Sequence, residues 1–243
     1  MNHSQQIDGV LLADKAAGMT SHDVVAIARR QLRSLGVEKV GHCGTLDPLA
    51  TGLLILTIGR GTKIQDLIMA EDKEYVGALK LGEVTDSQDA DGEITETKPV
   101  PELTRAQLDA AFAKFHGDFY QTPPMVSAIK KGGVPLYKLA RKGQTVEREP
   151  RFVHVYAHEI QAVRLPEIDF RVVCSKGFYV RTYAHDIGQE LGCGAHLRAL
   201  RRTKSGKFSV DLAVTVDEIK NGNPSEWTKK ILTLPQVSIL RGA

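Results

Sequence analysis

Short strand-like runs and amphipathic helix-like segments alternate irregularly along the chain, and this order most limits the folds open to it. Residues 53–58, apolar and bounded by Gly52 and Gly59, are typical of a buried strand. Irregular alternation favours a mixed α+β domain over a regularly wound parallel sheet. The predicted strands are 9–13, 53–58, 73–81, 152–163 and 169–174, and the predicted helices are 24–35, 104–115, 136–141 and 182–191.

Residues 121–151 interrupt this pattern. Pro123 and Pro124 break regular structure, and a basic stretch with Gly132 and Gly133 follows. We interpret the segment as an arm inserted into one main domain at 1–215, followed by a short tail at 216–243. A chain of 243 residues is long enough to bury a core of its own.

Charge is distributed unevenly. Residues 61–120 contain 6 Lys and Arg against 13 Asp and Glu, whereas residues 121–210 contain 16 against 7. A long basic segment with interspersed glycines and aromatics is typical of a surface that meets nucleic acid phosphates, although solvated faces also differ in sign by chance.

Cysteine content and the N-terminus indicate the compartment. Three cysteines without a CxxC motif do not form a disulfide framework, and the N-terminal residues lack the features of a secretion signal. No apolar run approaches the ~20 residues that cross a bilayer. We expect a cytoplasmic protein without membrane contact.

The segment at 41–52, GHCGTLDPLATG, is the strongest candidate for a site. Asp47-Pro48 is typical of a type I turn and would need no function. Glycines at 41, 44 and 52 indicate in addition that the backbone closely approaches something. A carboxylate on such a loop, next to a core strand, is a reasonable nucleophile or base.

A second cluster follows at 174–181. If this stretch is a strand, Tyr179 and Arg181 share a face and can point into one cleft. An arginine beside Asp47 would keep that carboxylate ionised. The alternative is a surface strand with an exposed ion pair of little energetic value, and spacing alone does not decide between them.

Metal and nucleotide sites are poorly supported. His154-x3-His158 and Cys193-x2-His196 each lack the further ligands that a zinc site needs. The segment around Lys63, GRGTK, suggests phosphate contact but has no nucleotide-loop spacing. We expect no cofactor.

At these segments the chain resembles the bacterial tRNA pseudouridine-55 synthases of the TruB family. The matching motifs run in the family's order over most of residues 8–210 and are specific in combination; they are DKAAGMTSHDVV, GHCGTLDPLATGLL, KEYVGALKLGEVTDSQDADGEI, TPPMVSAIKKGGVPLYKLARKG and CSKGFYVRTYAHDIGQELGCGAHLRALRRTKSG.

The resemblance implies a pseudouridine synthase fold, a mixed and mostly antiparallel sheet flanked by helices, in a catalytic domain at 1–215. It implies that the chain converts a tRNA T-arm uridine to pseudouridine without cofactor, guide RNA or protein partner. We expect a monomer, because the sequence shows no repeated apolar seam. Asp47 matches the catalytic aspartate, Tyr75 the tyrosine that packs on the target base, and Arg181 the partner of the aspartate. His42 matches the residue that replaces the flipped base, while Tyr179 and Leu200 line the pocket and Asp89 lies near the extruded nucleotides. Basic residues expected to meet RNA phosphates are Lys63, Lys130, Arg141 and Arg202.

The chain departs from the family pattern at several positions. Ala16 replaces a usual proline, Val126 replaces a common tyrosine, and Cys43 replaces a common threonine, which we interpret as a small buried spacer. Many members carry a C-terminal RNA-binding PUA domain, and we expect this chain, which ends at Ala243, to lack one.

Two other functions stay open from sequence. A non-catalytic RNA-binding or tRNA-folding protein would use the same basic face without needing Asp47. A nucleoside hydrolase would need a second carboxylate to activate water, for which Asp86, Asp89 and Asp91 are candidates.

Overall fold

The computed structural model describes residues 7–127, 129–140 and 143–242. The chain divides into two compact units: unit 1 is Met1–Tyr75 with Arg201–Ala243, and unit 2 is Val76–Leu200. The boundaries fall inside strands β4 (Lys73–Leu81) and β12 (Ala195–Ser205). Each of these two strands therefore contributes residues to both units.

Unit 1 is built around β3 (Thr51–Ile58). This strand pairs antiparallel with β1 (Gly9–Lys15) and with β2 (Val40–Cys43), and parallel with the Arg201–Arg202 part of β12. The short strand β14 (Val214–Thr215) pairs parallel with β1, and β13 (Phe208–Ser209) pairs antiparallel with β12. The helical elements of this unit are α1 (Ser21–Arg33), η1 (Gly59–Ile64), α2 (Gln65–Met69), η2 (Val210–Leu212), α6 (Val216–Asn221), α7 (Pro224–Trp227), η3 (Thr228–Lys230) and α8 (Leu234–Arg241).

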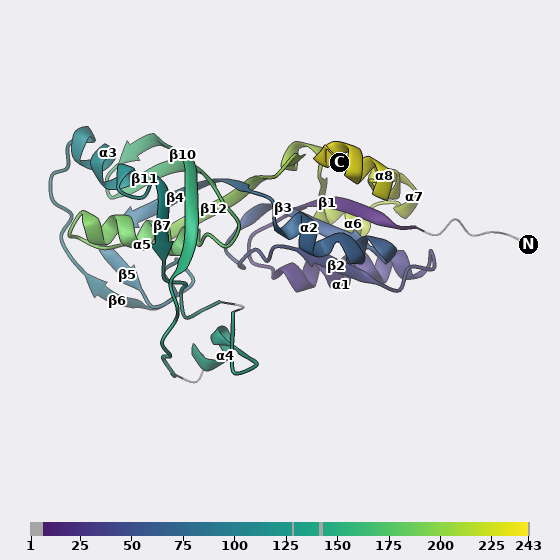
Figure 1. Cartoon of the computed structure of the whole chain (residues 1–243), viewed down its shortest axis with the longest axis horizontal. Helices are drawn as coiled ribbons and strands as arrows, with labels where there is room; N and C mark the ends of the chain where they lie inside the picture. The colour runs from purple at the N-terminus through teal and green to yellow at the C-terminus, as the bar shows by residue number, and fades with distance from the viewer. Residues whose placement is uncertain (1–6, 128, 141–142, 243) are drawn as a thin grey trace, which may run out of the picture. The chain divides into compact units, whose positions relative to one another are not determined.

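Both faces of β1 and β3 are buried. Val10 and Ile55 on one face join a core to which α2 contributes Ile68 and α8 contributes Val237. Side chains alternate across a strand, so Leu11 and its neighbours face the other side, where they are equally buried. Figure 1 shows α1 and α8 on opposite sides of β1. Because helices cover both faces, the sequences of the central strands are almost continuously apolar and do not alternate.

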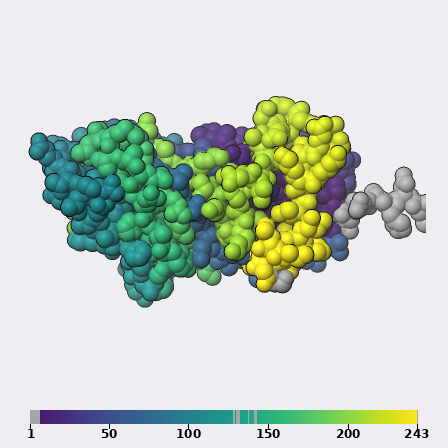
Figure 2. Space-filling view, turned by 90° about the horizontal axis from the view of Figure 1, so that it is seen from above, coloured from purple at the N-terminus to yellow at the C-terminus, as the bar shows by residue number. Residues whose placement is uncertain are grey.

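The C-terminal segment is part of the same unit. Main-chain hydrogen bonds join Val10 and Leu232 in both directions, at 2.9 and 2.8 Å. The C-terminal residues, yellow in Figure 2, accordingly lie against the purple N-terminal strand.

Unit 2 contains the remainder of β4 and β12 in the strand order β12-β4-β11-β10-β7. Strand β10 (Arg151–Arg164) pairs antiparallel with both β11 (Glu167–Cys174) and β7 (Gly117–Gln121). Helices α3 (Arg105–Ala113) and α5 (Val180–Glu190) cover one face, where the Phe112, Phe170 and Tyr183 rings meet edge to face. Buried and half-exposed side chains alternate along β11, and the half-exposed ones lie on its other face. This sheet is therefore buried on one side only.

Two small hairpins complete unit 2. Strands β5 (Glu83–Thr85) and β6 (Ile94–Thr97) pair with each other around an acidic loop, residues 86–92, with the sequence DSQDADG. Strands β8 (Lys130–Lys131) and β9 (Val134–Pro135), with α4 (Leu136–Ala140), lie in the connection between β7 and β10. This connection, at the bottom of Figure 1, is the segment predicted as an arm.

The predicted fold class, a mixed and mostly antiparallel sheet flanked by helices, is confirmed. The prediction that Tyr179 and Arg181 share a strand face is wrong. Gly177 at φ +81° ends the extended chain after β11, and α5 begins at Val180. Tyr179 is therefore the N-cap residue and Arg181 lies in the first helical turn.

Candidate active site

Asp47 lies on the loop that joins β2 to β3 in unit 1. The amide of Ala50 donates to the carbonyl of Asp47 at 3.1 Å, which closes the turn that the Asp-Pro dipeptide predicts. Leu46 and Ala50 are buried, whereas Asp47 is half-buried. The loop thus anchors two apolar side chains in the core and places Asp47 between them in a partly exposed turn.

Two side chains hold the residues on either side of Asp47. The Ser21 hydroxyl donates to the carbonyl of Leu46 at 2.9 Å and accepts from its amide at 2.8 Å. The ammonium group of Lys15, in a fully buried side chain, donates to the carbonyls of Ala16, Met19 and Pro48 at 2.9, 2.7 and 3.2 Å. The ends of β1 and α1 therefore fix the backbone around Asp47.

The glycines of this loop are explained by Arg202 on β12. A Cβ at Gly52, where φ is +94°, would lie 2.3 Å from the Arg202 carbonyl oxygen, and one at Gly44 would lie 3.2 Å from its guanidinium. That guanidinium donates to the carbonyls of Leu53 and Gly44 at 2.7 and 3.0 Å. The close approach expected from the glycines is thus made by the chain itself.

The burial of Arg202 changes the interpretation of this residue. Only 2% of it is exposed, and its donors point at main-chain carbonyls. The sequence predicted that Arg202 contacts an RNA phosphate, but this arrangement does not present the guanidinium to one. Arg202 instead positions the Asp47 loop.

Replacing Ser21 with alanine is expected to destabilise the protein by about 1–3 kcal/mol, because the buried amide and carbonyl of Leu46 lose their partner. Turnover should fall as well, since Asp47 is then less well positioned. Chemical denaturation and single-turnover rates measure the two effects. A Ser34→Ala control, in an exposed residue at the end of α1, should leave both nearly unchanged. Equal behaviour of the two variants would contradict the role given to Ser21.

His42 and Cys43 end β2, just before the loop. The half-buried His42 ring meets His22 edge to face at 5.3 Å. Burial, reinforced by His22 and Arg202, lowers the pKa of His42 to about 4, so the ring is neutral at physiological pH. Burial also raises the pKa of the Cys43 thiol to about 12, which fits a packing residue that stays protonated.

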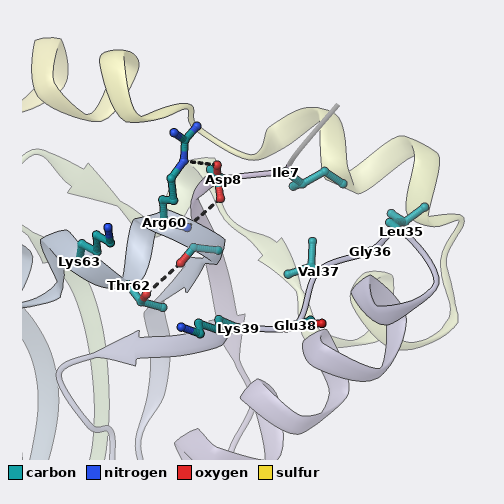
Figure 3. Close-up of a pocket in the computed structure, with 11 residues that line it drawn as sticks. Ile7, Asp8, Leu35, Gly36, Val37, Glu38, Lys39, Arg60, Thr62 and Lys63 are labelled. Carbon is teal, nitrogen blue, oxygen red and sulfur yellow. Dashed lines mark hydrogen bonds and ion pairs between the residues drawn. The ribbon is translucent and has the colours of Figure 1, made fainter. Parts of the chain in front are cut away.

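Tyr75 and Lys63 complete the predicted residues of unit 1. Tyr75 lies on β4 with 8% of its surface exposed. Lys63, on η1, is exposed and lines a cavity of about 490 Å³ together with Lys39 and Arg60 (Figure 3). Arg60 is held there by Asp8 at 2.5 Å.

In unit 2, Arg181 and Asp89 meet in a buried network. The Nε atom of Arg181 lies 3.5 Å from an Asp89 carboxylate oxygen, and both side chains are at most 6% exposed. The guanidinium also donates to the carbonyls of Ser87 and Val126, at 2.9 and 2.7 Å. The Ser87 hydroxyl donates to the other Asp89 oxygen at 2.6 Å. Arg181 therefore ties the acidic loop to the start of the arm.

Tyr179 and Leu200 have neighbours of their own in this unit. The Gln121 side chain donates to the Tyr179 carbonyl at 3.1 Å and accepts from its amide at 2.8 Å. Leu200 is 9% exposed, and a Cβ at Gly77 would lie 3.4 Å from its methyl group. Lys130 lies on β8 in the arm, and Arg141 lies outside the described residues.

Several positioning residues were not found from sequence. Ser21 directly follows Thr20, the N-cap residue of α1, and no sequence pattern marks its bonds to Leu46. Lys15 and Gln121 carry no spacing signal, because their partners are main-chain groups, most of them far along the chain. Within the described ranges, no helix is long and apolar enough to cross a membrane.

Comparisons with known proteins agree with the order of the motifs. A family model described as "TruB family pseudouridylate synthase (N terminal domain)" matches residues 32–180, and one described as "tRNA pseudouridylate synthase B C-terminal domain" matches residues 181–231. A tRNA pseudouridine synthase B of Opitutus terrae is 56% identical over 96% of this chain and 96% of its own length. One of Burkholderia lata is 49% identical over 89% of this chain and 66% of its own length.

Among solved structures, a chain of a Cbf5-Nop10-Gar1 complex is similar with a TM-score of 0.72 and 29% identity. The similarity covers 98% of this chain and 63% of that chain.

Proposed function

Because the chain belongs to the TruB family of pseudouridylate synthases, we propose that it isomerises the uridine at position 55, in the T arm of tRNA, to pseudouridine. The family and its named tRNA pseudouridine synthase B relatives support a pseudouridine synthase that acts on tRNA. The observation that carries the proposal is the Asp47 loop, whose backbone is fixed on both sides of this half-buried aspartate.

The chemistry requires a carboxylate near the sugar or the base. The N1–C1′ glycosidic bond breaks, the C5–C1′ bond forms, the C5 proton leaves and N1 takes up a proton, so the product is an isomer and no electron is gained or lost. A base stacked inside the RNA loop is out of reach, and the uridine must first be flipped out. Asp47 then acts as nucleophile or base, and its fixed backbone reduces the misalignment that would slow the reaction.

The remaining roles follow the resemblance. In this proposal Tyr75 stacks on the flipped uracil, and the neutral His42 ring fills the space that it leaves. Tyr179 and Leu200 line the pocket, and Asp89 lies near the extruded nucleotides. Arg181 is the arginine partner of Asp47 that the resemblance implies. A neutral imidazole suits a position between bases, because no charge has to be desolvated there.

Cationic side chains hold the RNA backbone in this proposal. We assign this role to Lys63, with Lys130 and Arg141 of the arm, and no longer to Arg202. No cofactor, guide RNA or protein partner enters the proposed reaction. Each phosphate contact should steepen the salt dependence of binding by roughly 0.7–0.9 in the log–log slope.

A T-arm stem-loop with labelled uridine tests the proposal. We expect the protein to convert the label to pseudouridine in the presence of EDTA and without added nucleotide. Binding without conversion would favour an RNA-folding protein instead, and release of free uracil would favour a hydrolase. Either result would contradict the proposed activity.

A further inference from the structure

The outward face of the β7–β10 hairpin in unit 2 carries a row of aromatic rings. Tyr120 is 72% exposed, Phe152 is 60% exposed and Tyr156 is 48% exposed. His154, between the last two, is partly exposed. These four residues are called the aromatic row below. Large rings are normally withdrawn from water, so a group of them on one exposed face indicates a binding surface.

The strand geometry aligns these rings. Tyr120 and Phe152 are register partners, and their ring centroids are 5.6 Å apart at an interplanar angle of 68°. Phe152, His154 and Tyr156 are alternate residues of β10, and the His154 and Tyr156 rings pack together with their centroids 4.3 Å apart at an interplanar angle of 50°. Aromatic side chains on a sheet surface stack on unpaired bases in known RNA-binding domains.

The fold does not need these rings for its core. On the opposite face of β10, Val153 and Val155 are 1% and 0% exposed and supply the packing beneath the strand. The β7–β10 ladder is formed by main-chain pairs from Arg151↔Gln121 to Val155↔Gly117. Truncation of Tyr120 and Phe152 therefore removes surface rings and leaves the buried face intact.

The row lies at the base of the basic arm. Tyr120 and Phe152 directly flank residues 121–151, which contain seven Lys and Arg and two Glu, a net charge of +5. Arg151 and Lys138, both exposed, are among these cations. A carboxylate oxygen of Asp118 lies 2.6 Å from the Nδ1 atom of the His154 ring. Cations that can bind phosphates thus lie beside aromatic rings that can stack on bases, a combination typical of proteins that bind single-stranded nucleic acids.

We propose that the aromatic row stacks on unpaired nucleotides of the RNA whose backbone the arm holds. The inference rests on the proposed function, since it adds a second set of contacts to the same RNA. It assigns affinity for unpaired segments to Tyr120 and Phe152 in particular, because these two rings are the most exposed and lie nearest to the arm.

Two RNA probes test the inference: a T-arm stem-loop with blunt ends and the same stem-loop extended by six unpaired adenosines. Wild-type protein should bind the extended RNA about tenfold more tightly, a modest value for aromatic stacking. A Tyr120→Ala/Phe152→Ala variant should bind the two RNAs equally. The salt dependence of binding should stay unchanged, because stacking releases no counterions. The single variant Phe152→Ala should give an intermediate ratio.

Matched controls separate stacking from general effects. Tyr120→Phe keeps a ring and should keep the tenfold ratio. Ile94→Ala removes an exposed apolar side chain of the same unit, 58% exposed on β6, and should also keep it. Circular dichroism should show all variants folded.

Equal binding of the two RNAs by wild-type protein would overturn the inference, as would a tenfold ratio that survives the double substitution. Loss of self-association in the double variant, with RNA binding unchanged, would instead identify the row as an interface between copies. Conversion of the blunt stem-loop by wild-type protein tests the proposed function separately, so each idea can fail alone.

Discussion

An Asp47→Asn variant is expected to lose at least about a thousandfold in single-turnover rate, while its stability and RNA affinity stay close to wild type. The amide is nearly isosteric with the carboxylate but can neither attack carbon nor accept a proton at neutral pH. The hydrogen bonds that fix the loop go to the backbone of Leu46, Pro48 and Asp47 itself, so the substitution leaves them in place.

The matched control is Asp66→Asn, which changes an exposed carboxylate of α2 in the same unit. It should keep the wild-type rate. If Asp47→Asn retained more than a few per cent of the wild-type rate, Asp47 would be neither the nucleophile nor the base.

The second large effect is expected for Arg181→Lys. The charge is retained, but a point-like ammonium cannot serve the carbonyls of Ser87 and Val126 and the carboxylate of Asp89 together, as the planar guanidinium does. We expect the single-turnover rate to fall on the order of a hundredfold, because the residues that Arg181 holds in place would shift. Stability should fall by about 1–3 kcal/mol, because a buried acceptor loses its donor.

Arg105→Lys provides the control for this variant. Arg105 also pairs with an aspartate in unit 2, Asp109 at 2.9 Å, but both side chains are more than half exposed. An exposed pair contributes little to stability, so this variant should behave like wild type. A wild-type rate for Arg181→Lys would mean that the arginine has no part in organising the site.

Local pattern predicted much of the fold. The apolar run at 53–58 and the alternating run at 73–81 are strands, and the stripes at 24–35 and 104–115 are helices with slightly different ends. Strand β12 was missed because its sequence, AHLRALRRTKS, is rich in cations. Its alternation is hidden, since Arg202 is buried and pairs with main-chain carbonyls that no sequence pattern marks.

The sequence predicted some parts of the candidate site and missed others. The glycines around Asp47 correctly indicated a close approach, because a Cβ at Gly52 would collide with the β12 backbone. Lys15 and Ser21 could not be recognised, since a buried lysine bonded to three carbonyls looks in sequence like any strand-end lysine. The secondary structure predicted for Arg181, a strand, was wrong, because the residue lies in helix α5. Its burial beside Asp89 gives it the acidic partner that an arginine needs inside a protein.

The most direct test of the proposed activity is position-resolved mapping of pseudouridine in a whole tRNA transcript treated with the pure protein in EDTA. The account predicts complete conversion of one uridine, at position 55 of the T arm, and no conversion by the Asp47→Asn variant. Conversion at other positions only, or equal conversion by both proteins, would contradict it.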